Sequence, residues 1–179
     1  MKSIAVYCGA SSGADPRYAT AARALAQALV AHNIALVYGG GKVGLMGVIA
    51  DEVLRLGGEA TGVIPKALLE REVGHAGLTR LFVVKDMHER KAMMSDLAEG
   101  FIAMPGGFGT LEELFEMVTW AQLGIHAKPI GLYNVDGFWN GLVDFAGQMV
   151  DKGFVRPAHA ALLQVEEDPD ALIGRLRGA

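Results

Sequence analysis

The chain has 179 residues, 51% of them hydrophobic and 20% charged, and this composition excludes a disordered or low-complexity protein. Its 16 basic and 20 acidic residues give a net charge of −4 without any basic run, so we expect no binding to nucleic acid or to an acidic membrane surface. The only cysteine, Cys8, has no partner for an intramolecular disulfide and indicates a cytoplasmic protein.

Six short apolar segments, partly β-branched, predict strands along the chain. They cover residues 3–9, 34–40, 60–65, 80–86, 101–106 and 129–135. The first predicts a strand rather than a signal peptide, and none is long enough to cross a membrane. Apolar residues at helical spacing predict helices near residues 45–56, 87–98, 111–123 and 138–149. Asp15-Pro16 and Asp168-Pro169 each predict the start of a further helix, because Asp is a good N-cap and Pro fits the first helical position.

The alternation of strands and helices predicts a doubly wound α/β fold. Strands that are apolar along nearly their whole length are typical of a mostly parallel sheet that helices cover on both faces. The chain shows no linker and no fixed-period repeat, so we expect residues 1–179 to form a single Rossmann-like domain. Ligands bind at the carboxyl ends of the strands in such sheets, and the turns after Gly9, Gly39 and Pro105 are therefore the candidate sites.

The turn at residues 39–44, GGGKVG, matches the dinucleotide-binding pattern G-x-G-x-x-G. That pattern also needs an acidic residue at the end of the next strand, and Glu59 precedes its strand instead. The glycines therefore favour close approach of the backbone to a smaller phosphate, or else a tight turn with a purely structural role. Lys42 could contact such a phosphate or face the solvent.

A second glycine-rich turn, PGGFGT at residues 105–110, leads from a strand into a helix. Its backbone can pass close to a ligand, and the helix start offers free N–H groups, so we expect a phosphate here with a hydrogen bond from Thr110. Thr110 and Glu113 also form a capping-box pattern, in which they would only stabilise the helix start. A carboxylate in the first helical turn is expected to be ionised, which makes Glu113 a candidate base, nucleophile or cation stabiliser rather than a proton donor.

Arg90 is the candidate partner of Glu113. It shares a helix face with Met87 and Met94, and an arginine on an apolar face can snorkel to the solvent, pair with a carboxylate or face a cleft. Because its helix directly precedes the strand at residues 101–106, Arg90 and Glu113 can reach one pocket. No cluster of His, Cys, Asp or Glu has the spacing of a metal site.

Two motifs, MHERK at residues 87–91 and PGGFGTLEE at residues 105–113, closely resemble the LONELY GUY (LOG) family of cytokinin riboside 5′-monophosphate phosphoribohydrolases. Members of this family are often labelled possible lysine decarboxylases. Residues 8–13, 39–47 and 119–126 extend the resemblance over nearly the whole chain. The combined motifs are specific for the superfamily and less specific for the substrate.

The resemblance implies hydrolysis of the N-glycosidic bond of AMP or of an N6-substituted adenosine 5′-monophosphate, with no metal or organic cofactor. The products would be the free base and ribose 5-phosphate. It implies that Arg90 and Glu113 are catalytic and that the protein is a homodimer with its site near the subunit interface. The implied substrate-binding residues are Glu72, Arg90, Lys91, Gly107, Phe108, Gly109, Thr110, Leu111, Glu112, Glu113 and Thr119.

Two other functions are compatible with parts of the pattern. One is a nucleotide- or cofactor-binding carrier on the same fold, resembling molybdenum-cofactor carriers. Such a carrier would need neither Arg90 nor Glu113, so the presence of both favours the enzyme. The other is a decarboxylase, which would need a lysine that binds pyridoxal phosphate, and neither Lys42 nor Lys91 lies in such a signature.

Overall fold

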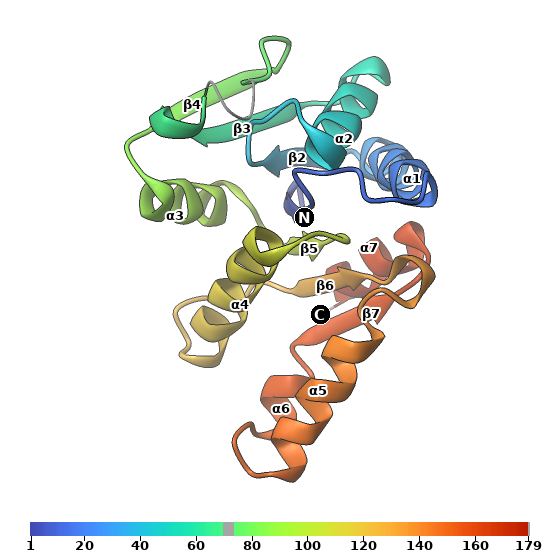
Figure 1. The fold of residues 1–179 in the computed structure, drawn as a ribbon, viewed down its shortest axis with the longest axis vertical. Helices are drawn as coiled ribbons and strands as arrows, with labels where there is room; N and C mark the ends of the chain where they lie inside the picture. The colour runs from blue at the N-terminus through green and yellow to red at the C-terminus, as the bar shows by residue number, and fades with distance from the viewer. Residues whose placement is uncertain (70–73, 179) are drawn as a thin grey trace.

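The structure is a computed structural model that describes residues 1–69 and 74–178, and within them it holds a parallel sheet of seven strands (Figure 1). The strands are β1 (Ser3–Tyr7), β2 (Ala35–Tyr38), β3 (Ala60–Pro65), β4 (Arg80–Val84), β5 (Phe101–Ala103), β6 (Ile130–Tyr133) and β7 (Leu163–Glu166). Their order is β4-β3-β2-β1-β5-β6-β7, and all neighbouring pairs are parallel. The predicted doubly wound fold is therefore confirmed, with the reversal of strand order between β1 and β5.

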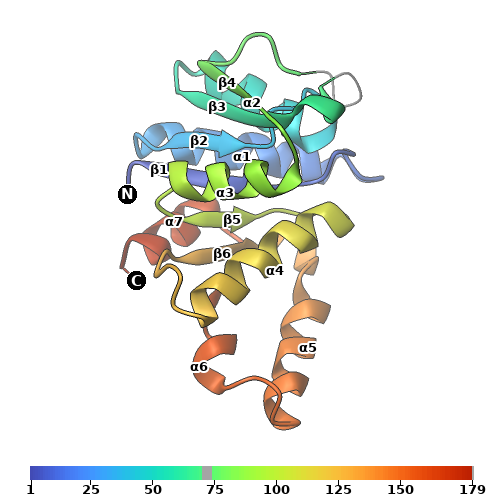
Figure 2. The ribbon, with the colours of Figure 1, turned by 90° about the vertical axis from the view of Figure 1, so that its left-hand side faces the viewer.

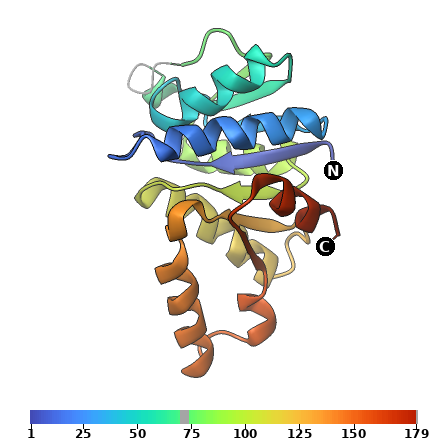
Figure 3. The same cartoon turned by 90° about the vertical axis from the view of Figure 1, so that its right-hand side faces the viewer.

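Helices cover both faces of the sheet. One face carries α1 (Arg17–Ala31), α2 (Gly44–Arg55) and α7 (Pro169–Gly178), as Figure 3 shows, and the opposite face carries α3 (Met87–Leu97) and α4 (Phe108–Gln122), as Figure 2 shows. The side chains of β1 alternate between the two apolar cores beneath these layers. The remaining elements are the helices α5 (Asn140–Asp151) and α6 (Pro157–Ala160) and the 3-10 turns η1 (Lys66–Leu68) and η2 (Val135–Gly137).

The structure confirms the predicted helix start at Asp168, whereas α1 begins at Arg17 with Pro16 at its N-cap, one residue later than Asp15-Pro16 predicts. Asp15 Oδ1 accepts a hydrogen bond from the backbone N–H of Arg17 (2.9 Å), and Asp168 Oδ1 accepts one from that of Ala171 (2.8 Å). The sequence pattern does not predict β7 or α6. All four residues of β7 are half-buried at a sheet edge, which weakens the apolar signal, and α6 is a single turn.

The start of α4 differs from the capping-box prediction. The helix begins at Phe108, with Gly107 at the N-cap and no side-chain cap. Thr110 is therefore the third helical residue and Glu113 the sixth, in the second turn of the helix. A capping-box carboxylate belongs at the third helical residue, so Glu113 is not a cap. The helix-dipole argument for its ionisation loses its basis, because the dipole effect falls off within the first turn, and the ionised state of Glu113 stays a prediction.

Within the described residues, no helix has both the length and the apolar character that a membrane span requires. The cytoplasmic location indicated by Cys8 stays a prediction.

Candidate active site

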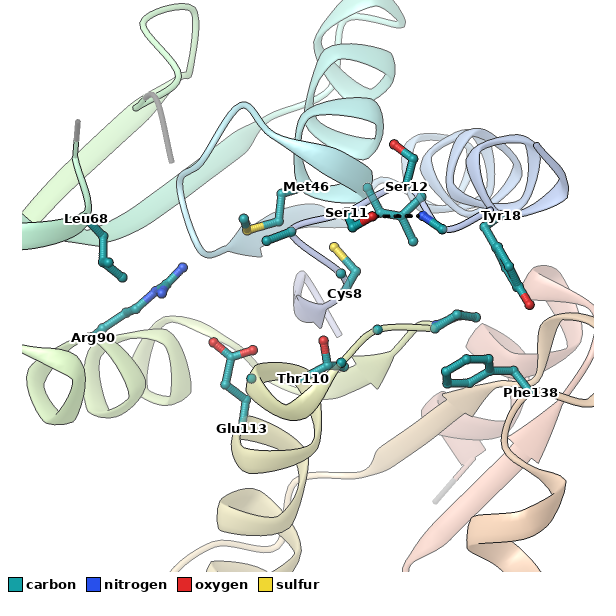
Figure 4. A pocket seen from close by; sticks show the side chains of 18 of the residues that line it. Cys8, Ser11, Ser12, Tyr18, Met46, Leu68, Arg90, Thr110, Glu113 and Phe138 are labelled. Atoms are coloured by element: carbon teal, nitrogen blue, oxygen red, sulfur yellow. Dashed lines mark hydrogen bonds between the residues drawn. The ribbon is translucent and has the colours of Figure 1, made fainter. Parts of the chain in front are cut away.

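A pocket of about 480 Å³ opens at the carboxyl edge of the sheet, where the strand order reverses (Figure 4). Its lining comes mainly from the turns after β1 and β5, residues 8–13 and 105–107, and from the first turns of α2 and α4. Side chains from other segments complete it: Tyr18, Leu68, Met87, Arg90 and Phe138. Each contributing segment follows the carboxyl end of a strand, as expected for a ligand site in a doubly wound sheet.

The turn after β5 packs directly on the turn after β1. The backbone N–H of Gly9 donates to the carbonyl of Pro105 (3.1 Å), and a Cβ on Gly106 would lie 2.1 Å from Thr110 Oγ1. Only glycine therefore fits at position 106. At Gly107, by contrast, an added Cβ would meet no protein atom within 4 Å, because this part of the turn faces the open pocket. The N–H groups in the first turn of α4 have no side-chain cap and can bind an anion.

Arg90 is buried, and carbonyl groups at the ends of two strands hold it in place. Its Nε donates to the carbonyl of Val63 in β3 (3.1 Å), and its Nη2 donates to the carbonyl of Gly39 directly after β2 (2.8 Å). Its Nη1 lies 3.7 Å from Met87 Sδ. The residue is only 4% exposed and lines the pocket, so it faces the cleft rather than snorkelling to the solvent.

The turn at residues 39–44 serves the site indirectly, since none of its residues lines the pocket. A Cβ on Gly39 would lie 2.0 Å from Arg90 Nη2, so the guanidinium keeps its present position only beside a glycine. Gly40 and Gly44 have positive φ angles of 77° and 56°, which the tight turn needs. Lys42 is exposed and contributes nothing to the lining. These contacts give Gly39, Gly40 and Gly44 structural roles, and the approach of a phosphate to this turn stays a prediction.

Glu113 projects from α4 into the pocket that Arg90 enters from α3 (Figure 4). Burial and then the charge of Glu113 raise the pKa of the Cys8 thiol, and only the more weakly acting Arg90 lowers it. Burial and then Glu113 also raise the pKa of Tyr7. Cys8 therefore remains a protonated thiol and is a poor nucleophile. Among the described lining residues, Arg90 and Glu113 carry the charges available for chemistry.

The pocket gathers five of the predicted substrate-binding residues: Arg90, Gly107, Gly109, Thr110 and Glu113. Three others on α4 lie elsewhere. Leu111 packs against the apolar core between α4 and the sheet, whereas Phe108 and Thr119 are exposed to the solvent. Contact of these three with substrate stays a prediction.

Lys91 and Glu112 also lie outside the pocket lining. The ammonium of Lys91 pairs with the carboxylates of Glu112 and Glu116, between α3 and α4. Glu72, the remaining predicted contact, lies outside the described residues.

The motifs do not indicate the aromatic end of the pocket. Tyr18 on α1 and Phe138 after η2 meet edge to face, with ring centroids 6.1 Å apart, and both line the cavity. Their only signal in the sequence is their position after the ends of β1 and β6. That position predicts proximity to a ligand site but not the direction of the side chains.

Comparisons with known proteins agree with the motif resemblance. A family described as "Possible lysine decarboxylase" matches residues 46–176. Cytokinin riboside 5′-monophosphate phosphoribohydrolase LOG7 of Arabidopsis thaliana is 49% identical over 176 residues, which cover 98% of this chain and 81% of that protein. The LOG2 protein of the same plant is 52% identical over 155 residues, which cover 87% of this chain and 73% of that protein.

Solved structures share the fold at lower sequence identity. The molybdenum cofactor binding protein from Rippkaea orientalis has a TM-score of 0.73 and 20% identity, covering 98% of this chain and 95% of that chain. The molybdenum cofactor carrier protein from Chlamydomonas reinhardtii has a TM-score of 0.70 and 20% identity, covering 99% and 98%. Likeness at this identity concerns the fold alone.

Proposed function

The chain belongs to the family that joins the possible lysine decarboxylases and the LOG phosphoribohydrolases, and from this premise we propose that it hydrolyses the N-glycosidic bond of adenosine 5′-monophosphates. The proposed substrates are AMP and its N6-prenylated forms, the cytokinin riboside 5′-monophosphates. The products are the free base and ribose 5-phosphate. The observation that carries the proposal is the entry of Arg90 and Glu113 into one pocket beside the uncapped N-terminus of α4.

The charges of the pocket suit the chemistry of this bond. Its cleavage builds positive charge on the ribose, as in glycoside hydrolysis. A carboxylate at Glu113 can stabilise that charge, activate a water molecule or attack the anomeric carbon. A phosphate at the first-turn N–H groups of α4 and at Thr110 would bring the ribose to Glu113, because residues three apart on a helix are neighbours on one face. Arg90 is too weak an acid to give up a proton, so its proposed role is electrostatic and orienting.

A decarboxylase has less support. No lysine is found among the described residues of the pocket lining. Lys42 is exposed, and the ammonium of Lys91 is engaged by two carboxylates of α4. Neither is placed to form a Schiff base with a cofactor in this cavity.

Release of free base is the direct test. We expect the protein to release adenine from AMP and isopentenyladenine from isopentenyladenosine monophosphate, each with an equal amount of ribose 5-phosphate, as measured by chromatography. The ratio of kcat/KM for the two nucleotides measures the preference, and the apolar wall formed by Met46, Leu68 and Met87 favours the prenylated one. Nucleotide binding without release of base from either compound would contradict the enzyme and support the carrier.

We also propose a homodimer, because exposed apolar side chains concentrate between residues 108 and 154. They are Phe108, Phe115, Leu123, Ile125, Phe138, Val143, Phe145 and Phe154. Of the residues in α5, only Ala146 is buried, so the apolar face of this helix has little cover within the chain. In a dimer, the same face of a second chain would cover the apolar face of α5.

Light scattering after size-exclusion chromatography tests the dimer. We expect a mass twice the 18.9 kDa of one chain. Phe145→Glu places a charge on the exposed face of α5 and is expected to shift the mass to that of the monomer. A wild type that elutes as a monomer at assay concentrations would contradict the proposal.

A further inference from the structure

Lys91 carries a buried charge next to the catalytic pair but outside its pocket. The side chain is 5% exposed, although lysine is among the residues most rarely buried without a partner. Its neighbour in the chain, Arg90, lines the pocket, whereas Lys91 does not. Adjacent residues of a helix point in different directions, so Arg90 points from α3 into the cavity, whereas Lys91 points toward α4.

The partners of Lys91 are both on α4. Its Nζ donates to Glu112 and lies 3.1 Å from Glu116 Oε2. Burial by itself lowers the pKa of Lys91, but its contacts with these two carboxylates and their negative charges together outweigh burial and raise the pKa above its usual value. Glu112 and Glu116 are four residues apart on one helix face, where like charges repel unless a cation lies between them. The three residues form an ion cluster that joins α3 to α4.

On each helix, one residue of the ion cluster is the neighbour in sequence of one residue of the catalytic pair. Arg90 precedes Lys91 on α3, and Glu113 follows Glu112 on α4. The backbone of α3 packs mainly against the strands β1 to β4, so this ion cluster is a direct link from α3 to α4. Any change in the separation of the two helices changes the separation of Arg90 from Glu113.

We propose that Lys91 is a positioning residue that sets the geometry of Arg90 and Glu113 by joining α3 to α4, and that it does not contact the substrate. The inference rests on the function proposed above. Displacement of a catalytic group by about 1 Å can lower the rate about a hundredfold, whereas the proposed phosphate site is the uncapped start of α4. The motif-based assignment of Lys91 to substrate binding makes the opposite prediction, a loss of affinity.

The decisive experiment is a double-mutant cycle of Lys91→Met and Glu116→Gln, with kcat, KM and the Kd for ribose 5-phosphate measured for each variant. We expect Lys91→Met to lower kcat about tenfold or more while KM and Kd change by less than about threefold. Adding Glu116→Gln to Lys91→Met should lower kcat by no more than about twofold, because both changes break the same link. Lys91→Arg should restore part of the lost kcat, since a guanidinium can also bridge two carboxylates.

Lys85→Met is the matched control, because Lys85 is exposed just before α3 and lies outside the pocket, and we expect wild-type values for it. An increase of KM and Kd by about tenfold in Lys91→Met, or effects that multiply in the double variant, would overturn the positioning role while leaving the hydrolase intact. If Lys91→Met does not fold, a kcat for Glu116→Gln equal to wild type overturns it as well. A wild type that releases no base overturns the proposed function and this inference together.

Discussion

Glu113→Gln is expected to lower kcat by about a thousandfold or more, equivalent to about 4 kcal/mol of transition-state stabilisation. The amide has nearly the shape of the carboxylate but no charge, so it can neither stabilise a cationic ribose nor activate water. Because Glu113 is in the second turn of α4 and does not cap the helix, we expect little change in the melting temperature. Affinity for ribose 5-phosphate should also be kept, since its proposed phosphate site is the uncapped helix start. Single-turnover release of base, measured together with thermal unfolding, checks both expectations.

Glu167→Gln provides the matched control, because this glutamate is exposed and far along the chain from the pocket residues. It removes the same charge from the protein without touching the cavity. Retention of more than about a tenth of wild-type kcat in Glu113→Gln would show that another group performs the chemistry. Equal losses of activity and stability would instead indicate a structural role for Glu113.

The fold is largely predictable from this sequence because its signals are local. Apolar runs predict six of the seven described strands, and the aspartate before Pro169 predicts the start of α7. β7 escapes prediction because an edge strand with four half-buried residues has no continuous apolar run. The start of α4 is mispredicted because Thr110 and Glu113 have the spacing of a capping box, whereas the N-cap of the helix is Gly107. Local patterns thus predict which elements form more reliably than where they begin.

The site is less predictable because distant residues decide it. The sequence identifies Arg90 as unusual on its helix face but leaves three orientations open. The choice is made by the carbonyls of Val63 and Gly39, which precede it by 27 and 51 residues. The direction of Lys91 is likewise decided by Glu112, 21 residues further on. The spacing of residues within one helix cannot predict these contacts, because the fold of the whole sheet brings the contacting residues together.

A substitution at Gly39 can change the position of the Arg90 guanidinium without altering Arg90 itself. Gly39 has no side chain where the guanidinium passes. A Cβ at position 39 would lie 2.0 Å from Nη2 and 3.0 Å from Met46 Sδ. The φ angle of Gly39 is not in the positive range, so alanine needs no strained backbone. Arg90 is the far end of a flexible side chain and can move aside. The substitution is therefore expected to displace the guanidinium and to leave the fold nearly unchanged.

Gly39→Ala is accordingly expected to lower kcat/KM by about a hundredfold, equivalent to about 2.7 kcal/mol, with only a small fall in melting temperature. Displaced from the carbonyls of Gly39 and Val63, the guanidinium keeps its charge but loses its orientation in the pocket. Gly174→Ala is the control, because its Cβ would meet no atom within 4 Å on α7, and alanine in a helix is neutral or stabilising. If Gly39→Ala stays within about threefold of wild-type kcat/KM while the protein is folded, the fixed geometry of Arg90 is not needed for turnover. A large loss of activity at an unchanged melting temperature would show that a glycine outside the cavity determines catalysis, because it leaves room for the arginine inside it.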